Sequence, residues 1–198
     1  MNPRNPGSLV RMREIVLVRH GETEWSAAGR HTSVTDLDLT PDGERRAALL
    51  AGRLAGRSFG LVLCSPRTRA QRTAVLAGLA PVVTDGDLAE WNYGDYEGLT
   101  TAQIREHDPA WTIWSGTTPG GETAAQVATR ADRVLDRVRP VLSSADVCLV
   151  AHGHFLRVVT ARWLGLPPRD GALFKLETAT LSVLGYERDT PTLLQWNA

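Results

Sequence analysis

The chain is 198 residues long, with 42% hydrophobic and 22% charged residues, which is typical of one globular domain. Its 22 basic and 22 acidic residues give a formal net charge of zero, which excludes the basic excess of a general nucleic-acid or anionic-membrane binder. No run approaches the ~20 apolar residues of a membrane span. Cys64 and Cys148 lie in apolar runs and are expected to be buried free thiols, which favours a reducing cytoplasm.

We expect a single domain over residues 1–198, with a loose tail over 1–13. Residues 15–18 are aliphatic and β-branched, as in a strand that is buried on both faces. Thr40 is the expected N-cap of a helix that runs to about residue 54, because Pro41 suits the first helical position. The next predicted elements are a strand over 61–64, an arginine-rich helix over about 67–77 and a strand over 81–84.

Residues 86–120 change in character and predict a lid-like excursion over the domain that adds no strand to the central sheet. Their glycines are accompanied by Trp91, Tyr93, Tyr96, Trp111 and Trp114. Exposed aromatic side chains in this segment would suit a substrate or a subunit contact. The sequence is therefore compatible with a homodimer but does not establish the oligomeric state.

The last predicted elements are a helix over about 123–142, a strand over 147–150, a helix over about 155–164 and strands over 180–186 and 193–196. Apolar strands that alternate with helices predict a three-layer α/β/α sandwich with a mostly parallel central sheet. In such folds ligands bind outside the carboxyl ends of the strands. Chemically capable groups follow three of the first four predicted strands, namely Arg19-His20, the run from Ser65 to Arg69, and His152.

The Arg19-His20-Gly21 run indicates an anion site rather than a histidine that merely packs in the core. The permanently charged guanidinium of Arg19 beside an imidazole is energetically costly unless an anion binds there. The cation also favours the neutral, nucleophilic form of His20, and Gly21 permits a ligand to approach the backbone closely. Arg69 lies near a helix start, which attracts anions, and its fork suits a dianionic phosphate.

The His152-Gly153-His154 run has two interpretations. Two histidines at this spacing can bind a metal ion, but a metal hydrolase needs further ligands, and no Asp-rich strand end supplies them. Placed beside His20, His152 would instead donate to phosphoryl oxygens and stabilise charge in the transition state. His154 is also compatible with simple packing at the following helix start.

A leaving alcohol needs a proton, so a carboxylic acid is expected near these groups. Glu90 lies among aromatic residues and is one candidate. Spacing alone does not choose between Glu90, Asp95 and Glu97.

Together these residues resemble the histidine phosphatase superfamily, in its phosphoglycerate mutase-like branch. The resemblance covers nearly the whole chain, from Ile15 to Tyr186, and begins with the Arg-His-Gly-Glu-Thr run followed by Trp25. The runs at 90–98, 120–123 and 151–154 look like those of acid phosphatase and sedoheptulose-bisphosphatase-like members.

The resemblance implies a role for each matching position. His20 corresponds to the nucleophile that becomes phosphohistidine, and Glu90 to the acid that protonates the leaving oxygen and later activates water. The phosphate pocket is matched by Arg19, Arg69 and His152. Family members touch substrate at the positions of Ser26, Thr32, Ser33, Tyr93, Gly153 and His154, although Ser26 replaces an asparagine common in mutases. The resemblance implies no metal, no organic cofactor and a small phosphorylated substrate, with no nucleic-acid or membrane partner.

Hydrolysis and mutase-type phosphoryl transfer are two activities of this architecture. A mutase must hold a second phosphate or a carboxylate while the phosphoryl group moves, which requires several cations over the pocket. The excursion over 86–120 contains only Arg105, among many acids. An acidic, aromatic segment favours phosphomonoester hydrolysis, with a mutase as the alternative.

Two further classes are distinguished by experiment. A metal-dependent hydrolase built on His152 and His154 would be sensitive to a chelator. A binding module without turnover would need only the cations, so the presence of both His20 and Glu90 argues against it.

Overall fold

Alternate side chains of the first strand, β1 (Ile15–Arg19), enter two different hydrophobic cores. In the computed structural model, which describes residues 13–198, Ile15 and Leu17 pack in one core and Val16 and Val18 in the other. Successive side chains of a strand point to opposite faces of a sheet. A strand that is apolar at every position must therefore be covered on both faces, which confirms the predicted α/β/α sandwich.

The central sheet has six strands in the order β3-β2-β4-β1-β5-β6. β1, β4, β2 and β3 are parallel, and β5 is antiparallel to both β1 and β6, so the sheet is mostly parallel as predicted. The remaining strands are β2 (Phe59–Cys64), β3 (Val83–Thr84), β4 (Asp146–Ala151), β5 (Leu181–Glu187) and β6 (Thr190–Gln195).

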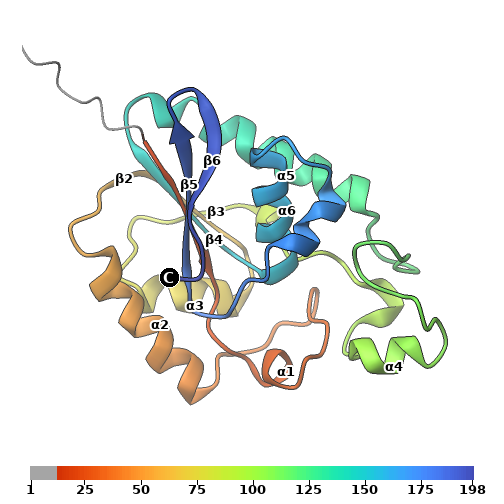
Figure 1. The fold of residues 1–198 in the computed structure, drawn as a ribbon. Helices are drawn as coiled ribbons and strands as arrows, with labels where there is room; N and C mark the ends of the chain where they lie inside the picture. The colour runs from red at the N-terminus through yellow and green to blue at the C-terminus, as the bar shows by residue number, and fades with distance from the viewer. Residues whose placement is uncertain (1–12) are drawn as a thin grey trace, which may run out of the picture.

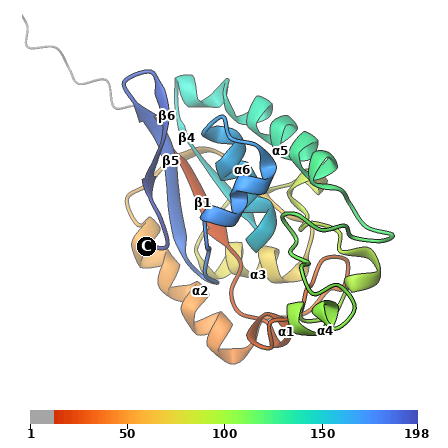
Figure 2. The same ribbon diagram turned by 45° about the vertical axis from the view of Figure 1, so that its right-hand side comes forward.

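Helices α2 (Pro41–Leu54) and α3 (Thr68–Leu76) cover one face of the sheet, and α5 (Ala124–Val138) and α6 (Gly153–Trp163) cover the other (Figure 1, Figure 2). The Thr40 side chain accepts a hydrogen bond from the Gly43 amide at 3.0 Å, which confirms the predicted cap of α2. The short helix α1 (Glu24–Ala27), which lies between β1 and α2 in the chain, was not predicted.

Two helix boundaries differ from the prediction. α5 ends at Val138 and not near 142, because Pro140 cannot continue a helix and the chain forms the 3-10 turn η3 (Val141–Ser143). α6 starts at Gly153 and not near 155, since a carboxylate from elsewhere in the chain accepts its first amides. The turn η4 (Pro168–Leu173), after α6, was also not predicted.

The excursion over 86–120 contains η1 (Gly86–Leu88), η2 (Gly94–Tyr96) and α4 (Thr101–Arg105), and it adds no strand to the sheet. Its large aromatic residues are mostly buried: Trp91, Tyr93 and Trp111 are 1%, 2% and 1% exposed. They belong to the same hydrophobic core as α5 and α6. The expectation that these aromatics are exposed and available for a subunit contact is therefore wrong for these three residues.

Cys64 and Cys148 are buried free thiols, as predicted. Burial raises the pKa of Cys64 to about 12, and it also raises the pKa of Cys148. Within residues 13–198 no helix is both long enough and apolar enough to cross a membrane. The predicted tail over 1–13 lies outside the described residues, apart from Arg13.

Candidate functional site

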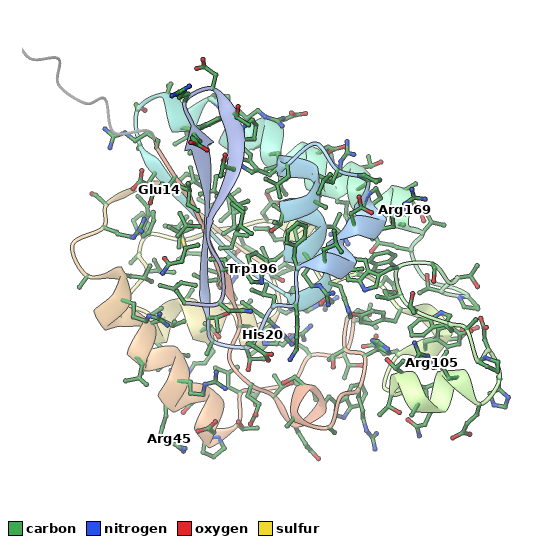
Figure 3. All side chains as sticks on the ribbon, viewed as in Figure 1. Glu14, His20, Arg45, Arg105, Arg169 and Trp196 are labelled. Carbon is green, nitrogen blue, oxygen red and sulfur yellow. The ribbon has the colours of Figure 1, made fainter. Side chains whose placement is uncertain are left out.

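A cavity of about 260 Å³ lies where β1 and β4 end, between these strand ends and the excursion. His20, which follows β1, lies in the interior, whereas Arg45, Arg105 and Arg169 lie on the outside of the molecule (Figure 3). Eight of the predicted site residues line the cavity, namely Arg19, His20, Ser26, Thr32, Glu90, Tyr93, Gly153 and His154. Three others, Ser33, Arg69 and His152, are not part of its wall.

The imidazole of His20 is held in one tautomer. Its Nδ1 lies 2.7 Å from the carbonyl oxygen of Gly21, so Nδ1 carries the proton that is donated to this oxygen. The Nε2 atom is then left with its lone pair. Burial, followed by the nearby charges of Arg69 and Arg19, lowers the pKa of His20 well below its ordinary value. The ring is therefore neutral near pH 7 and has a free nitrogen lone pair.

The guanidinium of Arg19 is buried beside His20 with part of its donor capacity unused. Its Nη1 donates to the Leu176 carbonyl, but its Nε is buried and has no hydrogen-bond partner among the described residues. A Cβ atom at Gly153 would lie 3.2 Å from the Arg19 Cζ, so a glycine there allows the guanidinium to approach the start of α6. A buried donor without a partner is costly, and an anion in the cavity would satisfy it.

Arg69 is fully buried and supports the wall of the site. Its Nη1 donates to the Thr35 carbonyl at 3.0 Å, and its Nη2 to the carbonyls of Thr32 and Ser33, each at 3.3 Å. These bonds hold the loop that carries Thr32 into the cavity. Burial lowers the pKa of Arg69, with the nearby carboxylates of Glu90 and Asp36 opposing that effect.

The ring of His152 lies against that of His20, with 5.0 Å between the ring centroids. Its Nδ1 accepts a hydrogen bond from Arg69 Nε at 3.3 Å, so Nε2 carries the proton and donates it to Ser65 Oγ at 2.7 Å. Burial and the neighbouring His20 and Arg69 lower its pKa. The predicted proximity of His152 to His20 is therefore present in the structure.

The carboxylate of Glu90 lines the cavity and caps α6 at the same time. Its Oε1 accepts hydrogen bonds from the amides of Trp91 and Phe155, both at 2.8 Å, and its Oε2 accepts one from the His154 amide at 3.0 Å. Two of these donors belong to the first turn of α6, where an anion is favoured. The contacts fix the carboxylate at the cavity wall.

The other acids of the stretch are placed differently. Glu97 accepts hydrogen bonds from the amides of Ser33 and Thr35, at 2.8 and 3.0 Å, and its Oε2 lies 2.5 Å from the Ser33 hydroxyl. Neither Glu97 nor Asp95 lines the cavity. The structure thus distinguishes three carboxylates that spacing alone could not distinguish. The contacts of Ser33 with Glu97 stabilise the loop to which Ser33 belongs.

The remaining predicted substrate positions are only partly free. Ser26 and Thr23 form a reciprocal capping box at the start of α1, with amide-to-hydroxyl distances of 2.9 and 3.2 Å. The Tyr93 hydroxyl lies 2.6 Å from Nδ1 of His154. Burial raises the pKa of Tyr93 and lowers that of His154, so both are neutral and share one hydrogen bond whose direction follows the tautomer of His154.

Sequence reasoning missed two cations of the cavity wall, Arg30 and Arg157. It counted charge only within residues 86–120, whereas Arg30 follows α1 and Arg157 is in α6. Of the acids counted there, only Glu90 lines the cavity, so the acidic composition of the excursion does not describe the site. Arg157 could have been found, because it lies three residues after His154 and so on the same face of α6.

The two histidines that could form a metal pair, His152 and His154, are engaged with other protein groups. Both ring nitrogens of His152 and the Nδ1 of His154 make hydrogen bonds to protein groups. In residues 13–198 no group of three or more His, Cys, Asp or Glu side chains is arranged to hold a metal ion.

Comparison with known proteins gives the same picture of the whole chain. Residues 15–198 match the family model described as histidine phosphatase superfamily (branch 1). An acid phosphatase of Mycobacterium tuberculosis is 48% identical over 90% of this chain and 89% of its own. The sedoheptulose 1,7-bisphosphatase of Saccharomyces cerevisiae is 36% identical over 88% of this chain and 75% of its own.

Among solved structures, that of an open reading frame product from Mycobacterium tuberculosis superposes with a TM-score of 0.91. It is 44% identical and covers 94% of this chain and 98% of its own. The order of the strands, the residues gathered at their carboxyl ends and these matches agree. The chain therefore belongs to the histidine phosphatase superfamily.

Proposed function

We propose that this protein is a phosphomonoester hydrolase that uses His20 as a nucleophile and needs no metal ion. The observation that carries the proposal is the state of His20. Its Nδ1 proton is held by the Gly21 carbonyl at 2.7 Å, and burial beside two arginines keeps the ring neutral. Such a ring presents a lone pair on Nε2 next to the unpartnered Nε donor of Arg19.

In the first step the Nε2 lone pair of His20 attacks the phosphorus atom of the ester. A nitrogen–phosphorus bond forms, the bond between phosphorus and the leaving oxygen breaks, and its electron pair stays on that oxygen. Glu90, which carries a proton at the start of this step, donates it to the leaving oxygen, so an alcohol departs. Arg19, whose Nε has no other partner, stabilises the charge on the three other phosphoryl oxygens. Arg69 and His152 would join it by exchanging their present partners, since Arg69 donates to loop carbonyls and the Nε2 proton of His152 is donated to Ser65.

In the second step water cleaves the phosphohistidine. Glu90, now a carboxylate, accepts a proton from the water, whose oxygen attacks phosphorus. The nitrogen–phosphorus bond breaks, and its electron pair returns to Nε2 of His20. Inorganic phosphate leaves and the site regains its starting protonation. The proposal also places the substrate against Ser26, Thr32, Tyr93, Gly153 and His154, which line the cavity.

Ser33, named as a substrate contact from the sequence, has a supporting role in this proposal. Its hydroxyl is bonded to Glu97 and its carbonyl to Arg69. A cytoplasmic location and a homodimer, both suggested by the sequence, stay predictions.

A mutase is the second candidate, and Arg30 and Arg157 favour it, because both are cations of the cavity wall outside the excursion. A mutase passes the phosphoryl group back to a second hydroxyl of the substrate instead of to water. Rapid equilibration of 3- and 2-phosphoglycerate by the purified protein, without release of phosphate, would establish the mutase and refute the hydrolase.

The direct test measures phosphate release from a panel of phosphomonoesters with a chelator present throughout. The intact protein is compared with His20→Ala, and His107→Ala is the matched control, because His107 is exposed and outside the cavity. We expect release by the intact protein and by the control but not by His20→Ala. Release by the intact protein that occurs only when the chelator is left out would refute the metal-free route.

The role of Glu90 has a separate signature. An aryl phosphate with an acidic phenol as leaving group needs little help from a proton donor, whereas an alkyl phosphate needs it fully. Glu90→Gln should therefore slow the alkyl ester far more than the aryl ester, and Asp95→Asn should slow neither. Equal slowing of both esters by Glu90→Gln would assign Glu90 to the cap of α6 alone.

A further inference from the structure

The cavity wall carries two cations besides the arginine that lies next to His20. Its wall includes Arg19, Arg30 and Arg157, and Glu90 is the only carboxylate among the described residues that line it. Both oxygens of Glu90 already accept hydrogen bonds from backbone amides. A phosphoryl group bound at Arg19 would leave two cations of the wall without an anionic partner.

Arg157 is held in a fixed orientation at this wall. Its Nε donates to the Gly171 carbonyl at 2.9 Å, its Nη2 donates to the Ala172 carbonyl at 3.1 Å, and its guanidinium lies 4.4 Å from the ring centre of Trp114. In the described part of the chain its Nη1 makes no hydrogen bond and its guanidinium makes no ion pair. Burial lowers its pKa only to about 10, so it remains charged near pH 7.

The spacing along α6 separates Arg157 from the phosphoryl site. Arg19 lies against Gly153, the first residue of α6. Arg157 comes four residues later, which is one helical turn, or about 6 Å along the axis at the usual rise per residue. One small molecule can carry two anionic groups that are about this far apart. Arg30 is exposed, and its guanidinium lies 6.0 Å from the ring centre of Trp25, so its charge acts from the rim.

We infer that Arg157, assisted by Arg30, binds a second anionic group of the substrate, so that the favoured ester carries a carboxylate or a second phosphate. The inference rests on the proposed function and names its substrate class. A guanidinium fixed by carbonyls and by an aromatic ring loses little freedom when it pairs with an oxyanion. The competing explanation is that Arg157 only fastens η4 to α6.

The test uses matched pairs of esters that differ in the second anion. Glycerol 3-phosphate is paired with 3-phosphoglycerate, and a hexose 6-phosphate with the hexose 1,6-bisphosphate. At low ionic strength we expect kcat/KM to be at least about tenfold higher for the member with the extra anion, since a hydrogen bond to a charged group contributes that much. The pair with the larger preference identifies the anion as carboxylate or phosphate.

The variants assign the preference to residues. Arg157→Met should reduce the preference about tenfold, and Arg30→Met should reduce it less, because exposed charges are screened. Arg169→Met is the control, since its side chain is 76% exposed and outside the cavity, and it should leave the preference unaltered. Thermal unfolding of each variant checks that it is folded.

The possible results distinguish the second-anion inference from the proposed hydrolase function. Equal hydrolysis of both members of each pair by the intact protein would overturn the inference and leave the proposed function standing. A preference that survives Arg157→Met in a folded protein would also overturn it. If Arg157→Met does not fold, the intact protein decides, because a preference that depends on this pairing must fall as salt rises. No release from any ester would overturn the proposed function and this inference with it.

Discussion

Arg130 of helix α5 connects this helix to the segment that carries Glu90, and we expect its substitution to lower the free energy of unfolding. Arg130 Nε donates to Glu122 Oε1 and Arg130 Nη2 to Glu122 Oε2, both at 2.7 Å. Its Nη1 also donates to the carbonyls of Asp87 and Ala89, at 2.6 and 2.9 Å. The two side chains of the ion pair are only 13% and 21% exposed.

The substitution Arg130→Met keeps most of the side-chain length and removes every one of these donors. It leaves the Glu122 carboxylate with only the Asn92 amide as a hydrogen-bond donor, and it removes the donor to the carbonyls of Asp87, Ala89 and Glu90. Breaking a buried pair by removing one partner costs about 3 kcal/mol at the lower end of measured cases. For a chain of this size we expect the melting temperature to fall by roughly 6–12 °C, at 2–4 °C for each kcal/mol.

The measurement is thermal and urea unfolding followed by circular dichroism. The control is Arg139→Met, because Arg139 pairs with Asp136 at 2.8 Å in an exposed position, and such a pair between residues about one helical turn apart contributes roughly 0.3–0.5 kcal/mol. The double variant with Glu122→Gln should be little worse than Arg130→Met alone, since both changes remove one interaction. A loss below about 1 kcal/mol for Arg130→Met would refute the reasoning, because surface ion pairs already reach that value.

Three further predictions concern packing, acid stability and thiol reactivity. Gly43→Ala should cost about 3 kcal/mol in urea unfolding, because the added Cβ would lie 2.2 Å from a backbone carbonyl of the loop after β1; an unchanged midpoint would contradict it. Hydrogen bonds from two arginines of α5 lower the pKa of Asp87 to about 2, so its ion pairs stabilise the folded state above about pH 4 and are lost as the pH falls toward 2. The stability difference between the intact protein and Asp87→Asn should shrink over that interval, and a constant difference would speak against these pairs. Cys64 and Cys148 should resist a thiol reagent in the native protein and react after unfolding, and rapid native reaction would show that they are accessible.

The sequence predicted an element correctly where its residues favour only one local structure. The apolar run of β1 predicted a strand covered on both faces, and Thr40 with Pro41 predicted the start of α2. The predicted start of α6 was wrong because its cause lies elsewhere in the chain. The start of α6 depends on the carboxylate of Glu90, more than sixty residues earlier, which no pattern near Gly153 contains.

The sequence alone determined the family, the α/β/α architecture and the convergence of Arg19, His20 and His152, because motifs at strand ends meet at one edge of a parallel sheet. Spacing left Glu90, Asp95 and Glu97 open, and the resemblance pointed to Glu90. The tertiary structure puts only Glu90 of the three in the cavity wall, since Glu97 is given other partners by folding. It also decided the charge of the site. Charge in a cavity depends on which side chains line it, and Arg157 reaches the wall from a helix far along the chain from the excursion.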